Sequence, residues 1–263
     1  MGHDDPWAIL VSEVMLQQTQ SSRVVGPWSR FIERFPTPGS CADATLAEVL
    51  RHWSGLGYPR RARALHLATQ CIRDEHAGRV PEALDALLAL PGVGDYTARA
   101  VASFAFHQRV AVLDTNVGRV LARALANRPL RAREARELAY ELLGRCASAP
   151  FNQAMIDLGA QYCRAVPQCD TCPVATACRW RREGGPDPAP KSASVSRPQS
   201  SFAGSDRQLR GVVLRNLRTG PLGAEQLRAV AGQPDRERFE RVLASLESDG
   251  LVVVAVDVRL WGD

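Results

Sequence analysis

Apolar residues recur at intervals of three and four through the first two-thirds of the chain, which is the pattern of amphipathic helices. The first such run follows Asp4, Asp5 and Pro6, which are typical of an N-cap with proline in the first turn. Strand signals are absent from this part, so it should be all-helical. Later helices are predicted over 20–34, 43–53, 60–75, 96–106, 117–126, 133–146 and 151–162.

The pattern changes after residue 183. Residues 184–204 are rich in Gly, Pro and Ser and bury too little to fold alone, which is typical of a flexible linker. Helices are then predicted at 205–218, 223–231 and 235–249, followed by a β-rich end, which is the order of a winged-helix domain. We therefore expect a mostly α-helical chain: a helical domain over 1–183, the linker, and a winged-helix-like domain over 205–263. The last domain is expected to serve in packing or protein contact rather than in base reading.

The stretch from Leu90 to Asn116 combines a glycine-paired turn, an apolar helix and a carboxylate. Gly92 and Gly94 would let the backbone adopt positive φ and approach a ligand, while the next helix directs free N–H groups toward it. Such an arrangement binds phosphate. A tight turn between two packed helices explains the same residues equally well.

The composition limits which partners the chain can bind and which reactions it can catalyse. The 263 residues carry a net charge of +5 with a pI near 9.0, which is compatible with nucleic acid. Lys191 is the only lysine and lies in the predicted linker, so a lysine Schiff base is excluded from the predicted helical domain. No apolar run approaches the roughly 20 residues of a membrane helix, and no signal segment precedes Pro6, so we expect a cytoplasmic protein without a membrane partner.

Four of the seven cysteines crowd into one short segment. They are Cys163, Cys169, Cys172 and Cys178, with spacers of five, two and five residues. In a chain without a secretion signal, such a cluster indicates a metal site rather than disulfides. Spacing alone leaves zinc and a [4Fe–4S] cluster as equal alternatives.

Five sequence blocks together resemble the MutY-type adenine DNA glycosylases of the helix-hairpin-helix superfamily, in order and over about residues 6–180. The blocks are Ser12-Glu-Val-Met-Leu-Gln-Gln-Thr19, Gly55-Leu-Gly-Tyr58, Leu90-Pro-Gly-Val-Gly94, Leu113-Asp-Thr-Asn-Val117 and the four cysteines. The resemblance implies a helix-hairpin-helix glycosylase fold, a [4Fe–4S] cluster on the cysteines, and double-stranded DNA carrying A:8-oxoguanine or A:G mispairs as the partner. We expect the protein to act as a monomer.

The reaction of this family requires two carboxyl groups with different roles. Cleavage of an N-glycosidic bond needs a proton for the departing base and a negative charge beside the oxocarbenium-like sugar. Glu13 lies on an otherwise apolar helix, where burial favours the protonated form. The resemblance assigns Glu13 to protonating adenine at N7 and activating water, and Asp114 to stabilising the sugar cation, with Asn116 and Tyr96 ordering the pocket. The alternatives are an exposed charge for Glu13 and a helix N-cap for Asp114, which can serve as both.

Further roles follow from the resemblance. The related endonuclease III family carries a lysine where this chain has Tyr96, so we predict base removal without strand cleavage. Gln18 and Tyr58 are the predicted intercalating residues, because the target base must leave the stack. Thr19 and Leu56 are predicted to lie against 8-oxoguanine, and Gly92 and Gly94 to hold a phosphate with their backbone N–H groups. Arg60, Arg61 and Arg63 favour a DNA-facing loop around Tyr58 over a core aromatic.

The chain departs from the family pattern in several places. The first cysteine spacer is one residue short, so the loop 164–168 should take a tighter path. Thr115 replaces the usual glycine between the Asp and the Asn. A segment with a Leu-Pro-Trp-Arg motif is expected ahead of Asp5, which suggests N-terminal truncation, and a Nudix-like C-terminal domain is not recognisable. We therefore predict weak discrimination between 8-oxoguanine and guanine opposite adenine; the alternative functions are a thymine/uracil mismatch glycosylase and a non-catalytic iron–sulfur DNA-binding protein.

Overall fold

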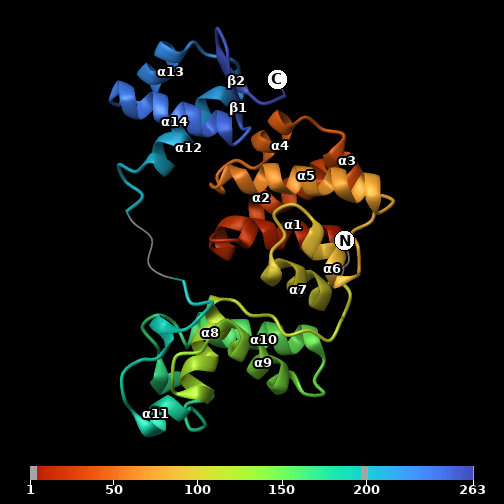
Figure 1. Ribbon diagram of the computed structural model, residues 1–263, viewed down its shortest axis with the longest axis vertical. Coiled ribbons are helices and arrows are strands. Elements are labelled where there is room, and N and C mark those ends of the chain that lie inside the picture. The colour runs from red at the N-terminus through yellow and green to blue at the C-terminus, as the bar shows by residue number, and fades with distance from the viewer. Residues whose placement is uncertain (1–4, 197–200, 263) are drawn as a thin grey trace. The chain divides into compact units, whose positions relative to one another are not determined.

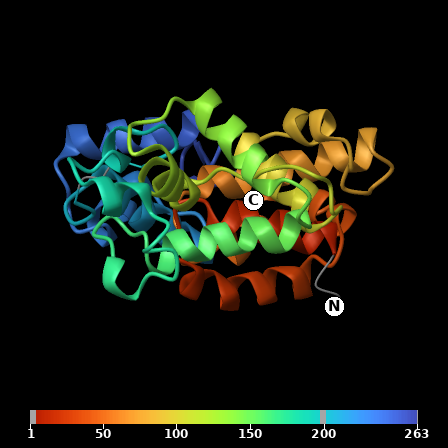
Figure 2. The ribbon, with the colours of Figure 1, turned by 90° about the horizontal axis from the view of Figure 1, so that it is seen from below.

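The computed structural model describes residues 5–196 and 201–262 (Figure 1). Helices joined by loops dominate both views, and the prediction of a mostly α-helical protein is confirmed (Figures 1 and 2). The chain divides into two compact units. Unit 1 holds the described residues of Met1–Ile9, Glu82–Leu84 and Gly94–Gln199, and unit 2 holds those of Leu10–Pro81, Asp85–Val93 and Ser200–Asp263.

Unit 2 begins with short helices arranged around α5. The helices are α1 (Pro6–Leu16), which starts in unit 1, α2 (Ser21–Arg34), α3 (Pro38–Ala42), α4 (Leu46–His52), α5 (Pro59–Glu75) and α6 (Leu84–Ala89). Both α3 and α4 pack on α5. Phe31 contacts Phe35 and Trp53 through tilted and edge-on ring pairs, and all three rings are buried. The Trp53 Nε1 also donates a hydrogen bond to the Gly57 carbonyl, so this aromatic cluster supports the loop that precedes α5.

The C-terminal part of unit 2 has the predicted winged-helix order. It contains α12 (Asp206–Asn216), a 3₁₀ turn (Leu217–Thr219), α13 (Ala224–Val230), α14 (Arg236–Ser248), β1 (Val252–Val254) and β2 (Val258–Leu260). The strands are antiparallel, with Val253 opposite Arg259, and Leu222 adds a bridge to Val258. Buried residues of the helices, such as Leu209 and Phe239, and of the hairpin, such as Val258, fill its core.

Unit 1 carries the helices on either side of the predicted catalytic aspartate. They are α7 (Asp95–Phe104), α8 (Thr115–Val120), which continues as a π-helical turn (Leu121–Ala126), α9 (Ala132–Leu143), α10 (Ser148–Gln161) and α11 (Arg179–Glu183). Helix α8 packs closely on α10. The core between these helices includes Val117, Leu121, Leu130 and Ala135.

Some local structure differs from the sequence-based prediction. The predicted turn at Pro36–Gly39 leads into α3, because the Thr37 and Ser40 side chains exchange hydrogen bonds with each other's backbone N–H groups and start a helix there. Helix α6 was not predicted. Asp5 accepts a hydrogen bond from the Trp7 N–H as the first turn begins, while the predicted capping residue Asp4 lies outside the described residues. Within the described ranges, no helix combines the length and apolarity that crossing a membrane requires.

Residues 186–196 pack against the helices of unit 1, the unit to which they belong, and we call them the strap. Ala189 is fully buried, the Ser192 hydroxyl accepts a hydrogen bond from the Leu130 N–H, and the Ala193 N–H donates to the Leu130 carbonyl. The sequence predicted a flexible linker over 184–204 because its composition cannot build a core of its own. The strap is ordered nevertheless, since unit 1 supplies its partners; residues 197–200 of the predicted linker lie outside the described chain.

Candidate active site

Glu13 lies on α1, one turn beyond Leu10 and next to Val14. Both neighbours are buried, and Glu13 itself is 7% exposed. The alternative of an exposed helix charge is therefore wrong. A carboxyl in such a place is suited to proton transfer, because burial keeps bulk water away from the acid.

Asp114 forms the N-terminus of α8. Its Oδ1 accepts a 2.7 Å hydrogen bond from the Val117 N–H, and its Oδ2 accepts one of 2.7 Å from the Asn116 Nδ2. Burial raises the pKa of Asp114 above the ordinary value, against these two hydrogen bonds, which lower it. Asp114 is therefore a helix cap, and it is also a half-buried carboxylate held in one orientation.

The extended segment leading into Asp114 is fixed by Asn152 on α10. The Asn152 Oδ1 accepts from the Val112 N–H at 3.0 Å, and its Nδ2 donates to the Val110 carbonyl at 2.8 Å. Ser103 and Ser148 complete the network, and both accept hydrogen bonds from the same Nδ2. Asn152 is 1% exposed, so these bonds satisfy a side-chain amide that water does not reach. By holding the backbone of residues 110–112, the Asn152 network fixes the position of Asp114, which follows them.

Arg119 connects the catalytic helix to the cysteine segment. Its Nη2 donates to the Asn116 Oδ1 at 2.6 Å and to the Gly159 carbonyl at 2.9 Å, and its Nε donates to the Cys163 carbonyl at 2.6 Å. Burial lowers the pKa of Arg119, while the nearby Cys163 and Asp114 raise it. One buried guanidinium therefore orients Asn116, which in turn orients Asp114.

Gly159 lets α10 approach α8 at this point. A Cβ at Gly159 would lie 2.5 Å from the Asn116 carbonyl oxygen and 2.6 Å from the Asn116 Cβ, which no side chain tolerates without movement of a helix. Sequence reasoning did not identify this position, because the close contact joins residues far apart in the chain.

We expect Gly159→Ala to reduce the free energy of unfolding by about 1–3 kcal/mol, as overpacked cores do. It should also slow adenine release, because the displaced Asn116 no longer holds Asp114. Urea unfolding and single-turnover assays measure the two effects. Gly211→Ala on α12 is the control, since its Cβ would meet nothing within 4 Å. Equal behaviour of the two variants would contradict the packing role of Gly159.

Tyr96 occupies the first turn of α7 and is half-buried. It lies in unit 1, as Asp114 does. The glycine turn before it differs in part from expectation. Gly92 has a φ of +75°, as predicted, but a Cβ there would lie 2.5 Å from the Ala64 Cβ, so packing on α5 also demands glycine. Gly94 has a φ of −90° and caps α7, so the prediction of positive φ is wrong for Gly94.

The loop between α4 and α5 contains three residues with left-handed backbone. Gly55, Gly57 and Tyr58 have φ values of +86°, +71° and +46°. A tyrosine with positive φ is strained, which is common where a side chain is held for binding. Tyr58 is half-buried, whereas Leu56 is 2% exposed. Gln18, at the end of α1, is exposed and also has a positive φ of +55°.

Arg61 fastens this loop to the end of α1. Its guanidinium donates to two α1 carbonyls, Val14 at 3.0 Å and Met15 at 2.8 Å, and just beyond α1 to the Gln17 carbonyl at 2.5 Å and the Thr19 Oγ1 at 3.1 Å. It also donates to two loop carbonyls, Leu56 at 3.1 Å and Gly57 at 3.3 Å. It also lies over the ring of Tyr58 at 5.2 Å. Burial lowers the pKa of Arg61 to about 10. Arg61 therefore joins the two segments that carry Gln18 and Tyr58, and the prediction that the Tyr58 loop faces DNA stays a prediction.

Arg61→Lys should separate these two segments. A lysine ammonium has three donors at one point and cannot replace a planar fork that reaches six acceptors. We expect the variant to fold with lower stability and to lose about 10- to 100-fold in affinity for mispaired DNA, the equivalent of one or two buried hydrogen bonds to a charged group. Equilibrium binding by fluorescence anisotropy provides the measurement. Arg30→Lys, on the exposed side of α2, should leave affinity unchanged.

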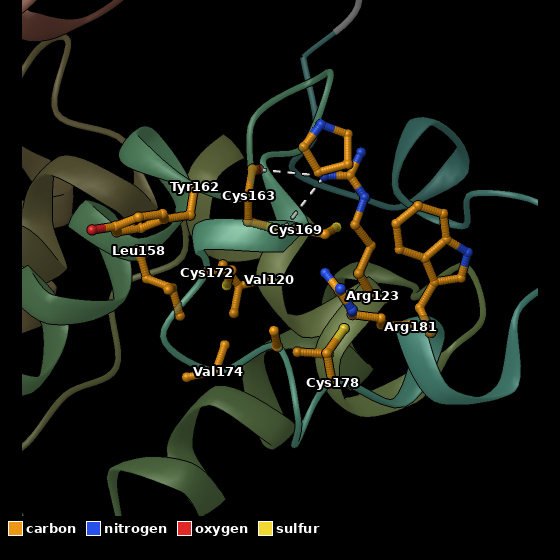
Figure 3. Close-up of a pocket in the computed structure, with 14 residues that line it drawn as sticks. Val120, Arg123, Leu158, Tyr162, Cys163, Cys169, Cys172, Val174, Cys178 and Arg181 are labelled. Atoms are coloured by element: carbon orange, nitrogen blue, oxygen red, sulfur yellow. Dashed lines mark hydrogen bonds between the residues drawn. The ribbon is translucent and has the colours of Figure 1, made fainter.

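The four cysteines line one pocket, which Figure 3 shows with Arg123 beside it. The loop 164–168 is closed by a hydrogen bond in which the Gln168 N–H donates to the Tyr162 carbonyl at 2.8 Å. Burial raises the pKa of the Cys163 thiol, and the Arg123 guanidinium lowers it by donating to Sγ at 3.4 Å. Despite the short first spacer, all four cysteines line this one pocket.

Arg123 ties the pocket to the strap. Its Nε and Nη2 make two hydrogen bonds to the Asp187 carboxylate at 2.8 and 2.6 Å, and its guanidinium lies 5.5 Å from the ring of Trp180. The side chain is 2% exposed. Sequence reasoning missed Arg119 and Arg123. The only signal in the sequence is that both arginines interrupt the apolar pattern of the helix after Asp114.

The sequence of the chain is similar to a family of DNA repair proteins and to individual glycosylases. Residues 11–145 match the HhH-GPD superfamily of base excision DNA repair proteins. The chain is 44% identical over 262 residues to an adenine DNA glycosylase of Mycobacterium tuberculosis, covering 97% of this chain and 84% of that protein. It is 46% identical over 260 residues to the adenine DNA glycosylase of Mycolicibacterium smegmatis, covering 96% and 86%.

Solved structures agree with the fold. A thermostable thymine-DNA glycosylase gives a TM-score of 0.63 at 27% identity, covering 68% of this chain and 86% of the other. A trapped endonuclease III–DNA covalent intermediate gives 0.63 at 28% identity, covering 70% and 87%. Identity is much higher to the adenine enzymes than to the thymine enzyme. The chain therefore belongs to the adenine DNA glycosylases of the HhH-GPD superfamily.

Proposed function

We propose that this adenine glycosylase acts on adenine opposite 8-oxoguanine or guanine, by hydrolysis and without cutting the strand, as a monomer. The observation that carries the proposal is the half-buried Asp114, oriented by the Val117 N–H and by Asn116. Tyr96 stands where a lysine nucleophile would be needed for strand cleavage, and Lys191, on the strap, is the only lysine. Thymine or uracil as the target base is the second candidate, and only the 27% identity to a thymine enzyme favours it.

The proposed reaction divides the work between two carboxyl groups. Protonated Glu13 donates to N7 of adenine, so that the C1′–N9 bond breaks with the electron pair leaving on the base. The ionised Asp114 stabilises the positive charge that develops on the sugar, as a fixed anion does for an oxocarbenium-like transition state. Water then adds to C1′, and the Glu13 carboxylate accepts the water proton. The products are free adenine and an abasic sugar, and Glu13 returns to its protonated state.

In this proposal Gln18 and Tyr58 enter the DNA stack, and Thr19 and Leu56 lie near the opposite 8-oxoguanine. Both loops carry left-handed residues that present side chains at a turn, which suits a wedge. Thr19 is held by Arg61, and Leu56 is buried, so contact of Leu56 with a base requires this loop to open. Gly92 and Gly94 contribute backbone N–H groups for a DNA phosphate.

The four cysteines would hold a [4Fe–4S] cluster. Thiolates bind both zinc and iron–sulfur clusters, and the four cysteines line one pocket. The resemblance of the five sequence blocks to the MutY-type glycosylases supports iron–sulfur over zinc at this site. The cluster would give structural support to the segment that Arg119 connects to Asn116. Visible absorbance with four iron atoms per chain is expected, and a colourless zinc protein would overturn this assignment.

Opposite-base preference is tested with duplexes that carry adenine opposite 8-oxoguanine, guanine, cytosine or thymine, and one with thymine opposite guanine. We expect rapid release of adenine opposite 8-oxoguanine and guanine at similar rates, and little release from A:T pairs. Equal release from A:T pairs, or release of thymine from the G:T duplex, would refute the proposed substrate.

A further inference from the structure

The C-terminal domain of unit 2 contacts the same loop that carries Tyr58. The Arg207 Nη1 donates to the Tyr58 hydroxyl at 3.4 Å, and the Arg51 Nε donates to the Arg218 carbonyl at 3.3 Å. Arg218 also donates to the Ser54 hydroxyl. A small pocket between the two parts is lined by Trp53, Pro59, Gly211, Leu214 and Leu260 among others. The domain is therefore built against the proposed DNA wedge.

Asp249, at the end of α14, bridges two arginines across this contact. Its Oδ1 lies 2.5 Å from the Arg60 Nη2, and its Oδ2 accepts a hydrogen bond from Arg210. The Asp249 side chain is 10% exposed, whereas that of Arg60 is 69% exposed. Burial alone would raise the pKa of Asp249, but hydrogen bonds from Arg60 and Arg210 hold it below the ordinary value. The carboxylate is thus ionised at neutral pH and acts as an internal anion for Arg60.

Arg60 is placed to bind a different anion when DNA is present. It follows Tyr58 by two residues, and most of its side chain is open to solvent. The guanidinium fork fits a phosphate and a carboxylate with the same geometry. The two anions therefore compete for one site. Gly250, next to Asp249, has a φ of +60°, and a Cβ there would lie 2.8 Å from the Arg63 Nε, so this turn fits closely against α5.

We propose that Arg60 is a phosphate-binding residue for the DNA backbone and that Asp249 occupies its guanidinium when DNA is absent. The inference rests on the proposed entry of the Tyr58 loop into DNA. The C-terminal domain then acts as a latch: DNA takes Arg60 from Asp249, while Arg210 retains the carboxylate. Competition of this kind weakens binding to DNA in general, so that the enzyme leaves undamaged sequence more readily.

The test measures binding to an undamaged duplex with Asp249→Asn, Arg60→Ala and the double variant, over a range of salt concentrations. Asp249→Asn should bind severalfold more tightly at low salt. Its log–log salt slope should steepen by up to about 0.9, the value of one phosphate contact, which is about 3.5-fold more loss of affinity between 50 and 200 mM salt. Glu240→Gln removes the same charge from an exposed site on α14 and should bind like the wild type.

The double-variant cycle decides whether Arg60 is responsible. In the Arg60→Ala background, Asp249→Asn should no longer change affinity or salt slope. A gain that persists there would overturn the proposal, because it would come from a disturbed domain or from net charge alone. An unchanged or weakened affinity of Asp249→Asn would also overturn it. Adenine release from mispaired duplex is measured separately, so failure of the proposed function is distinguished from failure of the latch.

Discussion

Glu13→Gln is expected to abolish adenine release while leaving DNA binding intact. Glutamine keeps the size and the polar outline of the side chain but cannot donate a carboxylic proton or take one from water. General acid–base catalysis contributes about 10²–10⁴-fold, so the single-turnover rate should fall by at least about 100-fold. The measurement is the rate of abasic-site formation at saturating enzyme, with affinity for the same duplex measured in parallel.

Glu33→Gln on the exposed face of α2 is the matched control, because it makes the same chemical change away from the proposed pocket. It should release adenine at the wild-type rate. Turnover in Glu13→Gln within a few-fold of the wild type would refute the role of Glu13 as acid and base. Loss of binding together with turnover would assign Glu13 to structure instead.

Asp114→Asn is expected to lose adenine release by a comparable factor without losing stability. Asparagine remains a good N-cap for α8, so the helix should still begin at this residue. The variant lacks the negative charge that stabilises the sugar cation, and this loss is felt only in the transition state. Single-turnover rates and urea unfolding at pH 7 separate the two properties.

The raised pKa of Asp114 gives this prediction a pH dependence. Because the pKa is higher in the folded state than in the unfolded chain, this residue's contribution to stability is fully present below the unfolded pKa and is lost as pH rises through the folded pKa. At neutral pH the ionised Asp114 therefore lowers the free energy of unfolding, and Asp114→Asn should be at least as stable as the wild type. Activity runs in the opposite direction, since it falls as acid protonates Asp114. A marked loss of stability at pH 7 in Asp114→Asn would contradict this account.

Helical periodicity was sufficient to predict most of the fold, because the spacing of apolar residues in an amphipathic helix marks the face that is buried. The order of the C-terminal domain was predicted in the same way. Asp114 was recognised as a cap from its residue type and its place before a helical run. The buried position of Glu13 followed from apolar neighbours on the same helix.

What the sequence could not reveal depends on contacts between distant segments. Arg61 resembled a surface cation, yet it binds carbonyls of α1 and of the Tyr58 loop. Gly159 resembled an ordinary helical glycine, although the backbone of Asn116 excludes any side chain there. Asp187 lies in a Pro-rich segment whose order depends on the buried Arg123. In each case the partner is far away in sequence and leaves no local pattern.

Hydrolytic removal of adenine by a chain without a catalytic lysine is tested most directly with a duplex that carries adenine opposite 8-oxoguanine. Free adenine and strand breaks are both measured, before and after treatment with alkali. We predict free adenine in an amount equal to the abasic sites, with strand breaks only after alkali. Strand breaks before alkali, a product trapped on the protein by borohydride, or no free adenine would contradict it.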